Sequence, residues 1–426
     1  MRQQKDKIKV FEHETLRLGS KYNGVSFDRN HYDALFKLNE LHDDKYFRFL
    51  HNGVCFKQYV GVIQVEGLTI EVLPKIDRST GNKNDWQNVL IDMLRIAKKM
   101  KVRNTENANV ERQSRHLLDM YFEWYLNEVN ALIHRGLIKQ YYRETGNIKA
   151  LKGKLEFAGH LSKNLVHKER FYTTHQVYGT DHIIHQILAK ALTIVSQFSK
   201  GTYVYSFCKT VQASFPEVKD CQINEATFTK LKENRKTAPY HTALKIAKFI
   251  ILQYAPNVKS GNENMLALLF DMNMLWEQYI LAKLQSAALG QNMIIHGQRE
   301  KAFWNGITIR PDIVIEKKDG DNKFRHFIID TKWKNVSGSK PTTDDLRQMY
   351  VYNDYWSSTD AMLLYPGVNS NFKGFTPFNI FGNKTEHHRC GIAELSIFSP
   401  ETNKLNENIG EEILEWFGLI KTKKLN

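Results

Sequence analysis

The 426-residue sequence has few of the features that mark secreted or zinc-binding proteins. It contains four cysteines and no C-x-x-C pair, which favours reduced thiols over a disulfide framework. Cys390 lies close to His387 and His388, but no second ligand pair at zinc spacing accompanies this cluster. We therefore expect a solvent-exposed loop there and no zinc site.

Long apolar segments and phosphate-binding loops are also missing. The first ten residues are charged and lack the apolar core of a signal peptide, and no apolar run reaches the length of a membrane span. No G-x-x-x-x-G-K-[ST] pattern occurs, so the chain is not expected to hydrolyse nucleoside triphosphates itself. These absences predict a cytoplasmic protein without membrane contact.

Positive charge is plentiful. The chain has 60 Lys and Arg against 46 Asp and Glu, a formal net charge of +14. This excess favours a polyanionic partner, most simply double-stranded DNA or another nucleic acid, although many basic proteins bind none. The length predicts two or three domains with a substantial core.

One stretch combines a hairpin pattern with acids in unusual places. Two apolar runs, 307–315 and 327–329, flank a polar segment in which Asp319–Gly320 is typical of a hairpin turn. The pattern predicts two adjacent strands. Asp312 interrupts the first run and Asp330 follows the second, at positions where a core strand normally has apolar residues.

These acids suit metal-assisted hydrolysis of a phosphodiester. Asp330 and Lys332 are two residues apart and leave a strand on the same face, and the hairpin would bring Asp312 to the same sheet edge. Mg²⁺ is usually held by one or two carboxylates, with water and substrate phosphate completing its shell. Lys332 would orient a water or stabilise negative charge. An isolated D-x-K also occurs by chance on exposed strands, so its context matters.

A third acid lies on a helix before the strands. Residues 271–289 have a helical pattern with Asp271 or Asn273 as N-cap. Glu277 falls on the same stripe as two apolar residues, Ile280 and Leu284. A carboxylate on an inward-facing stripe needs a partner. Either a metal site or a salt bridge to a Lys or Arg at the core edge would provide one.

The segments around these strands complete an α/β pattern. A further strand is expected at 299–304, a helix with a capping box from Thr342, and a short strand at 361–365. Gln348 and Tyr352, four residues apart, would share one face of that helix. The order helix, three strands, helix, strand predicts an α/β sandwich with its acids at the sheet edge.

We predict three domains, at residues 1–84, 85–260 and 261–426, with the last border near 259–264. The first is β-rich, with a short helix at 31–39 and strands at 46–50, 56–65 and 68–73. It is either a binding or adaptor module or an ordinary structural lobe. The third contains the acidic strands.

The middle region, 85–260, is predicted to be helical. Apolar stripes indicate helices near 86–97, 117–132, 184–198 and 242–254. Asp181 is a candidate cap of the third, and His182 and His185 are expected on its surface. Lys152 and Lys154 flank a glycine, and a basic segment follows at 163–170. This loop would approach a DNA backbone or would simply be solvated.

The acidic pattern resembles known nucleases. Pro311-Asp312 followed by Asp330-Thr331-Lys332 is similar to the PD-(D/E)xK nuclease superfamily. Over more of the chain, the sequence resembles the McrC family, the nuclease subunits of McrBC modification-dependent restriction systems. The matching segments are IEVLPKI at 70–76, LKGKL at 151–155, FDMN at 270–273 with WE at 276–277, RPD at 310–312 and IIDTKWK at 328–334.

The resemblance implies a fold, a site and a partner. It implies an αβββαβ nuclease core that uses Mg²⁺ or Mn²⁺ and cuts DNA at 5-methylcytosine-type modifications. The implied residues are Asp312, Asp330, Lys332 and Glu277 for catalysis, the three acids among them for the metal, and Gln348, Tyr352 and Arg310 for support or DNA contact. It also implies an AAA+ GTPase partner of the McrB type. Because residues 1–84 form a β-rich part without a catalytic constellation and include the IEVLPKI segment, we expect this partner to bind mainly there, with a protruding hairpin such as 56–73 entering its ring. A non-catalytic DNA-binding adaptor that regulates such a motor is the alternative.

Overall fold

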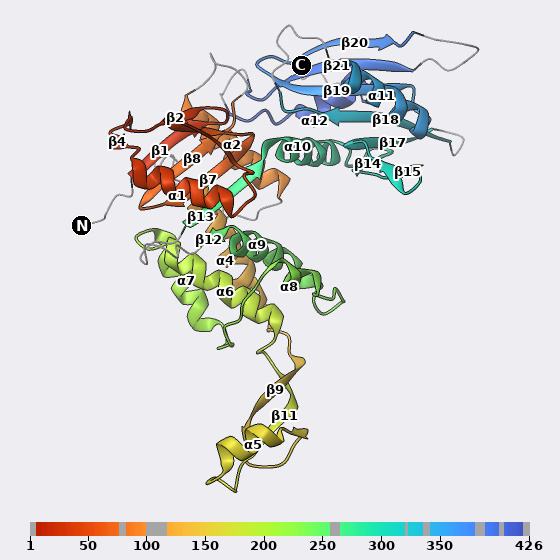
Figure 1. Cartoon of the computed structure of the whole chain (residues 1–426). Coiled ribbons are helices and arrows are strands. Elements are labelled where there is room, and N and C mark those ends of the chain that lie inside the picture. Colours follow the sequence, from red (N-terminus) through yellow and green to blue (C-terminus); the bar gives the residue numbers. More distant parts are fainter. Residues whose placement is uncertain are drawn as a thin grey trace. The chain divides into compact units, whose positions relative to one another are not determined.

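The computed structural model describes residues 6–75, 82–98, 117–255, 265–319, 323–334, 341–379, 388–399 and 404–420. The chain packs as two compact units, one of residues 1–5 with 102–268 and the other of residues 6–101 with 269–426. Figure 1 labels the elements of both. Residues 6–84 therefore share a unit with the C-terminal part. The expected border at 259–264 lies outside the described residues, and three independently folding domains remain a prediction.

The N-terminal part is built on a buried sheet. β1 (Asp6–Phe11) runs parallel to β8 (Leu68–Leu73), which pairs antiparallel with β7 (Tyr59–Val65). Every residue of β8 and all of β7 except Tyr59 are buried, as in strands covered on both faces. The expectation that this hairpin protrudes is therefore wrong, because its strands form the core of this part.

Two smaller sheets and two helices complete the N-terminal part. The strands are β2 (Thr15–Arg17), β5 (Phe47–Leu50) and β6 (Gly53–Phe56) in one sheet, and β3 (Lys21–Tyr22) with β4 (Val25–Ser26) in the other. The expected strand at 56–65 is thus divided between β6 and β7. The helices are α1 (Arg29–Glu40) and α2 (Lys83–Ala97), both close to their expected ranges.

The C-terminal part contains a six-stranded sheet in the order β14-β17-β18-β19-β21-β20. Its strands are β14 (Met293–Gly297), β17 (Ile313–Asp319), β18 (Lys323–Thr331), β19 (Asp360–Gly367), β20 (Asn371–Pro377) and β21 (Arg389–Ser396). β17 and β18 form the predicted antiparallel hairpin, whereas β18, β19 and β21 run parallel. The chain is therefore a mixed α/β protein, as expected.

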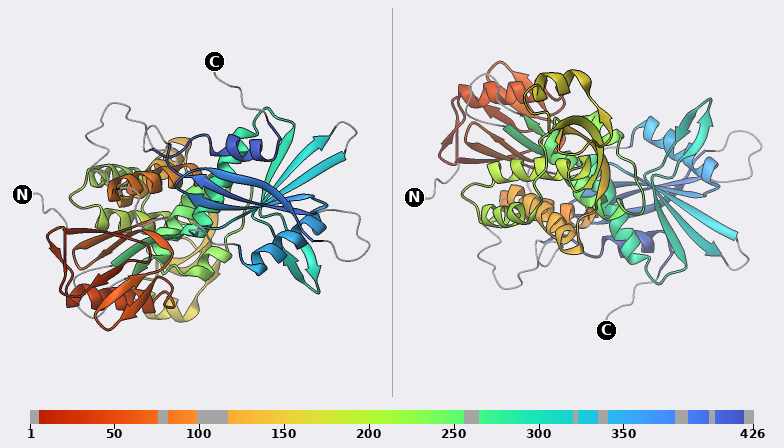
Figure 2. Two further views of the ribbon diagram at one scale, coloured as in Figure 1. Left: turned by 90° about the horizontal axis from the view of Figure 1, so that it is seen from above. Right: turned by 90° about the horizontal axis from the view of Figure 1, so that it is seen from below.

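Helices cover both faces of this sheet (Figure 2). On one face, α11 (Thr343–Trp356) buries Met349 and Trp356 against Val314 and Ile328. On the other, α10 (Met272–Ala287) packs against β14 and β18, and α12 (Ile409–Trp416) packs against α10. The predicted caps are present. The Asp271 side chain accepts hydrogen bonds at the start of α10, and a capping box begins α11.

The expected strand at 307–315 is interrupted. β16 (Ile307–Ile309) pairs with β15 (Lys301–Trp304) in a separate hairpin, and β17 begins only at Ile313. Pro311 lies in the gap, where its missing N–H cannot contribute to a ladder. The chain consequently leaves one sheet and enters another at residues 310–312, which places Asp312 immediately before β17.

The other unit contains three of the four helices expected in the middle region, namely α4 (Leu117–Arg135), α6 (Ile183–Phe198) and α9 (His241–Leu252), whereas the fourth, α2, lies in the unit of the N-terminal part. It also contains α7 (Tyr203–Ser214), α8 (Glu225–Thr229) and the 3₁₀ helix η1 (Ala238–Tyr240), which were not expected. Two strands, β12 (Tyr254–Ala255) and β13 (Met265–Asp271), follow, and in β13 the chain passes into the other unit. Among the described helices of the whole chain, none is long and apolar enough to cross a membrane.

This unit also contains a sheet that the sequence pattern did not predict. β9 (Gln140–Ile148) and β11 (Phe171–Gly179) pair along nine residues, with β10 (Lys154–Leu155) beside β11 and α5 (Phe157–Asn164) between them in sequence. We call residues 140–179 the arm. β9 alternates between half-buried and exposed positions, and most of its residues are polar. Its apolar period is therefore too weak to indicate a strand.

Two expectations about the start of α6 are wrong. His182 and His185 are 4% and 0% exposed, not on the surface. The N-cap is His182, without a side-chain cap, while the Asp181 carboxylate accepts a hydrogen bond from Gln186 Nε2 at 2.8 Å. The two imidazoles face inward because they bond to backbone and side-chain oxygens on neighbouring segments.

Candidate active site

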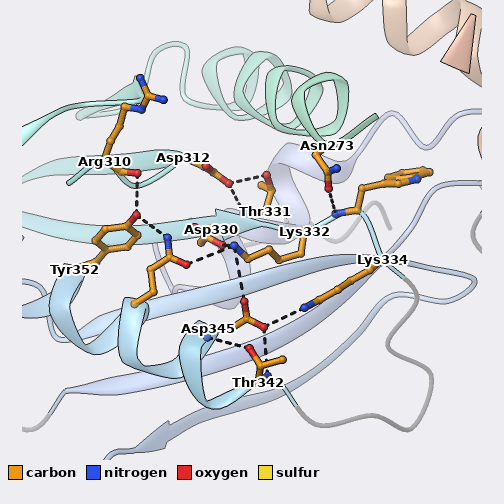
Figure 3. A network of polar contacts seen from close by, with 12 residues as sticks. Asn273, Arg310, Asp312, Asp330, Thr331, Lys332, Lys334, Thr342, Asp345 and Tyr352 are labelled. Atoms are coloured by element: carbon orange, nitrogen blue, oxygen red, sulfur yellow. Dashed lines mark hydrogen bonds and ion pairs between the residues drawn. The ribbon is translucent and has the colours of Figure 1, made fainter. Parts of the chain in front are cut away.

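The hairpin places Asp312 at the end of β18 (Figure 3). Ile313 is opposite Ile329, so the residue before β17 lies beside Asp330 and Thr331. Asp312 Oδ2 accepts hydrogen bonds from the Thr331 backbone N at 2.7 Å and from Thr331 Oγ1 at 2.9 Å. These bonds fix one oxygen of Asp312 at the sheet edge.

Asp330 and Lys332 form a close ion pair at the same edge. Asp330 is 2% exposed, and Lys332 Nζ lies 2.6 Å from its Oδ2. The backbone N of Lys332 donates to Leu364 O at 2.9 Å, which holds the residue against β19. The structure thus brings Asp312, Asp330 and Lys332 together, as the strand pattern predicts.

Electrostatics fix the protonation of this group. Burial raises the pKa of Asp330 to about 6, helped by the charge of Asp312 and opposed by Lys332. Burial alone would lower the pKa of Lys332, but the charges of Asp330, Asp312 and Asp345 outweigh it and raise the pKa. Lys332 is therefore an ammonium ion at neutral pH. It can stabilise negative charge but cannot accept a proton.

Glu277 lies beside the two aspartates. It is 9% exposed on α10, and burial, followed by the charge of Asp312, raises its pKa to about 7. Its Oε1 accepts a hydrogen bond from Gln298 Nε2 at 2.7 Å. Within the described part of the chain, Glu277 forms no ion pair with a Lys or Arg. The carboxylate therefore belongs to the acidic cluster.

Gln298 was not identified from the sequence. Its backbone N donates to Asp312 O at 2.8 Å while its side chain holds Glu277. Its φ of 49° lies in the left-handed region, which a residue other than glycine rarely adopts. One residue thus fixes two acids, and no sequence motif marks it.

Residues of α11 support the cluster from the opposite side. Tyr352 Oη donates to Arg310 O at 2.9 Å and accepts from Gln348 Nε2 at 2.8 Å. Gln348 Oε1 lies 3.5 Å from Lys332 Nζ. The Arg310 side chain points away from Tyr352 (Figure 3), and its Nη1 lies 3.2 Å from Glu300 Oε1. The predicted pair on α11 therefore connects the 310–312 segment to the lysine.

Asp345 has a second contact beyond its capping role. Its Oδ2 lies 3.0 Å from Lys334 Nζ, and its Oδ1 lies 3.9 Å from Lys332 Nζ. The sequence identifies Asp345 only as part of a capping box, although its charge also acts on the lysine of the site.

Lys152 and Lys154 belong to the arm, in the other compact unit. Lys154 pairs with Glu156 at 3.6 Å. Gly153 between them has φ +74°, and a Cβ there would lie 2.4 Å from Thr174 O. The glycine is therefore required for packing against β11, and this explains the motif without a phosphate ligand.

The acidic cluster fits an oxygen-preferring divalent cation. Asp312 raises the pKa of both Glu277 and Asp330, so the three carboxylates repel one another. Asp330 Oδ2 is buried and has no hydrogen bond of good geometry, although Lys332 lies close to it. No three His, Cys, Asp or Glu residues in the described ranges converge as a complete metal site. Mg²⁺ needs only one or two carboxylates together with water and phosphate.

The N-terminal part contacts the loop that follows the lysine. Trp333 Nε1 donates to Glu12 Oε1 at 2.7 Å, and the Trp333 and Trp276 rings meet edge to face with a centroid distance of 5.5 Å. Trp276 precedes Glu277, and Trp333 follows Lys332. Burial raises the pKa of Glu12 to about 7. One tryptophan thus joins the end of β1 to both sides of the site.

We expect Trp333→Phe to destabilise this contact. The substitution keeps an aromatic ring near Trp276 but removes the indole N–H that donates a hydrogen bond to Glu12. Glu12 Oε1 keeps its hydrogen bond from the Lys75 backbone N at 3.0 Å, so the substitution removes one of two hydrogen bonds and should lower the free energy of unfolding by about 0.5–1.5 kcal/mol, as measured by urea denaturation. Trp304→Phe, at a residue 67% exposed, is the control and should change nothing. Equal stability of the two variants would contradict the importance of this bond.

Known proteins resemble this chain over much of its length. The family model described as "McrBC 5-methylcytosine restriction system component" matches residues 54–366. The chain is 22% identical over 297 residues to "Type IV methyl-directed restriction enzyme EcoKMcrBC" of Escherichia coli (strain K12), an alignment that covers 63% of this chain and 82% of that protein.

A solved structure has a similar fold. The match is to a chain from an assembly of Thermococcus gammatolerans McrB AAA+ hexamers with bound McrC, with a TM-score of 0.62 and 17% identity over 96% of this chain and 99% of that chain. At this identity, the likeness establishes the fold alone.

Proposed function

The chain belongs to the family of McrBC 5-methylcytosine restriction system components, and from this premise we propose that it is the DNA-cleaving subunit of such a system. The observation that carries the proposal is the convergence of Asp312, Asp330 and the Lys332 ammonium at one sheet edge. This arrangement, with Glu277 beside it, is what the interpretation of the sequence as a PD-(D/E)xK nuclease requires.

Each residue has a distinct chemical task in this proposal. Asp312 and Asp330 would hold Mg²⁺ or Mn²⁺, with Glu277 beside them to complete the metal environment. When bound, the metal supplies an activated water and neutralises phosphate charge. Lys332 stabilises the negative charge that develops on the phosphate during attack. Gln298 positions Glu277, and Thr331 positions Asp312. Gln348 and Tyr352 hold the 310–312 segment and Lys332 in place.

We further propose that the subunit acts with an AAA+ GTPase of the McrB type. Support comes from the solved assembly with a similar fold, in which McrB AAA+ hexamers have McrC bound. The family's description as a 5-methylcytosine restriction system component supports a modified base as the target, and we propose that the partner recognises this base. The β7–β8 hairpin is buried in its sheet, whereas the arm extends away from the helices of its own unit (Figure 1).

The arm has an exposed apolar surface suited to a protein partner. Its side chains, which we call the arm patch, are Leu151, Phe157, Leu161, Leu165 and Val166, each between 61% and 84% exposed. A group of large apolar side chains this exposed is typical of an interaction site. We therefore assign the partner contact to the arm patch in place of the expected residues 1–84.

The function is tested by reconstitution. The purified chain is mixed with its candidate GTPase and with methylated or unmethylated plasmid, in the presence of GTP and Mg²⁺. We expect double-strand cuts in methylated plasmid only when all components are present. Cutting at an equal rate without the GTPase would contradict the role of the partner.

Magnesium should stabilise the protein more at a pH of about 8 than at about 5. Burial raises the pKa of Glu277 to about 7 and that of Asp330 to about 6. The metal-free native state therefore keeps protons that the unfolded chain releases. The contribution of these two carboxyl groups to the stability is greatest below their unfolded pKa values and is lost as pH rises through about 7. A cation bound to the ionised carboxylates would remove that loss.

Differential scanning fluorimetry measures this effect. Glu277→Gln should lose most of the magnesium-induced rise in unfolding temperature, while Asp344→Asn, a largely exposed carboxylate on α11, should keep it. A rise that is equal at both pH values, or unchanged in Glu277→Gln, would contradict the metal assignment.

A further inference from the structure

A basic groove lies where the arm joins the helices of its unit. It has a volume of about 630 Å³, and its walls include residues 138–141, Tyr178, Ile183, Ile184 and residues of the 230–236 loop. Four lysines line it, namely Lys139, Lys230, Lys232 and Lys236. These residues come from segments about ninety positions apart in sequence, so no linear motif marks the groove.

The positive charge of the groove is not neutralised by neighbouring acids. In the described part of the unit, none of the four lysine ammonium groups forms an ion pair. Two nearby acids pair with other lysines, Glu144 with Lys219 at 2.9 Å and Glu225 with Lys248 at 3.5 Å. A third, Glu233, lies 3.1 Å from His241 Nδ1. Four unpaired ammonium groups around one groove attract a polyanion.

Two tyrosines supply aromatic surface in the same groove. Tyr141 of β9 is directly opposite Tyr178 of β11, with ring centroids 4.8 Å apart. The side chains are 72% and 54% exposed, so solvent reaches a large part of both rings. Arg143 is exposed two residues further along β9, on the same face of the strand. It extends the basic and aromatic surface onto the arm.

The floor of the groove is held by buried hydrogen bonds. The backbone N of Ile138 donates to Tyr240 Oη at 3.0 Å, and Ile138 O lies 3.1 Å from His182 Nε2. His185 Nε2 lies 3.2 Å from Tyr240 Oη. This cluster accounts for the burial of both histidines, and it fixes the segment that presents Lys139 and Tyr141.

The lysine loop is also fixed. The Asn234 side chain accepts hydrogen bonds from the backbone N of Lys236 at 2.9 Å and of Thr237 at 3.1 Å. Thr237 is 7% exposed. The loop is therefore anchored at the point where it contributes three of the four lysines.

We propose that this groove binds a segment of single-stranded nucleic acid, with phosphates at the lysines and a base stacked on Tyr141 or Tyr178. Lysines along a groove follow the backbone, and exposed aromatic rings stack bases of any sequence. Phosphate charge alone would also suit a free nucleotide, but the four lysines and two tyrosines are spread around the groove, and the exposed Arg143 adds a further cation on the arm beyond Tyr141. This surface fits a strand of nucleic acid that is longer than one nucleotide. The proposal does not depend on nuclease activity.

Fluorescence anisotropy of a labelled oligothymidylate of about 15 nucleotides tests the proposal. The full chain carrying Asp330→Asn is used in EDTA, so that no cleavage occurs. Tyr141→Ala should weaken binding about fivefold or more, while Tyr141→Phe, which keeps the ring, should bind like the parent. Lys230→Ala with Lys232→Ala should reduce the salt dependence by about 1.4 in slope.

The control has the same loss of charge at a different place. Lys200→Ala with Lys209→Ala changes two exposed lysines beyond the far end of α6 and should bind like the parent. Equal weakening in this control and in the groove variant would mean unspecific charge attraction and would overturn the proposal. Unchanged binding in Tyr141→Ala, or competition by thymidine monophosphate as strong as by the oligonucleotide, would also overturn it. Circular dichroism confirms that each variant is folded.

Discussion

Asp330→Asn is expected to abolish DNA cleavage while leaving the unfolding temperature unchanged or higher. The loss of activity should be roughly a thousandfold or more, about 4 kcal/mol of transition-state stabilisation, because the variant loses a metal-binding carboxylate. The stability should not fall, because burial penalises the Asp330 charge and raises its pKa to about 6. Asparagine carries no charge and has nearly the same volume as aspartate, so the substitution removes that penalty without changing the packing.

The three site residues should differ in their structural effects. Asp312 accepts two hydrogen bonds from Thr331, so Asp312→Ala leaves buried donors unpaired and should cost about 1–3 kcal/mol of stability as well as activity. Lys332→Ala should lose activity while keeping the strand, because its backbone bond to Leu364 remains. Asp344→Asn is the matched control and should keep both properties. Cleavage at the wild-type rate by Asp330→Asn would remove the proposed site.

Charged substitutions in the arm patch are expected to abolish GTPase binding. Phe157→Asp with Val166→Asp places two charges in an exposed apolar surface, where a protein partner would have to desolvate them. Co-purification with the GTPase and stimulation of its GTP hydrolysis should both be lost, and magnesium-dependent stabilisation should remain. Because Phe157 is 71% exposed and Val166 is 84% exposed, the fold should tolerate the changes.

The N-terminal part provides the competing outcome. Leu41→Asp changes a residue that is 61% exposed on that part and should leave partner binding intact. If Leu41→Asp prevents binding and the arm variant does not, the contact lies in residues 1–84, as expected from the sequence. Deleting residues 1–84 is a poor test, because β1 and Glu12 pack within the same unit as the acidic site.

The acidic site is predictable from sequence because its signals are local. A two-residue spacing on a strand and a hairpin turn suffice to bring Asp330, Lys332 and Asp312 together, and a four-residue helical spacing aligns Gln348 with Tyr352. Gln298 carries no such signal. Its role depends on a left-handed backbone conformation and on contacts to two distant elements.

The parts that were not predictable depend on contacts between distant segments. Whether the β7–β8 hairpin protrudes depends on what covers its two faces, and its apolar sequence fits either outcome. His182 and His185 follow a helical surface spacing, but Tyr240 and Ile138 approach from other segments and bury them. Most residues of β9 in the arm are polar, so no apolar alternation marks it as a strand. The strands form because β9 and β11 pair over nine positions.

The most direct test follows cleavage and GTP hydrolysis in the same reaction. Methylated plasmid is incubated with the GTPase and either the wild-type chain or Asp330→Asn. Each reaction is run once with Mg²⁺ and once with EDTA, which removes the free metal. If Asp330 is a catalytic residue of a metal-dependent nuclease, Asp330→Asn supports wild-type GTP hydrolysis in Mg²⁺ but makes no cuts. The wild-type chain then cuts only with Mg²⁺. Cuts at the wild-type rate by the Asp330→Asn complex would contradict this role of Asp330.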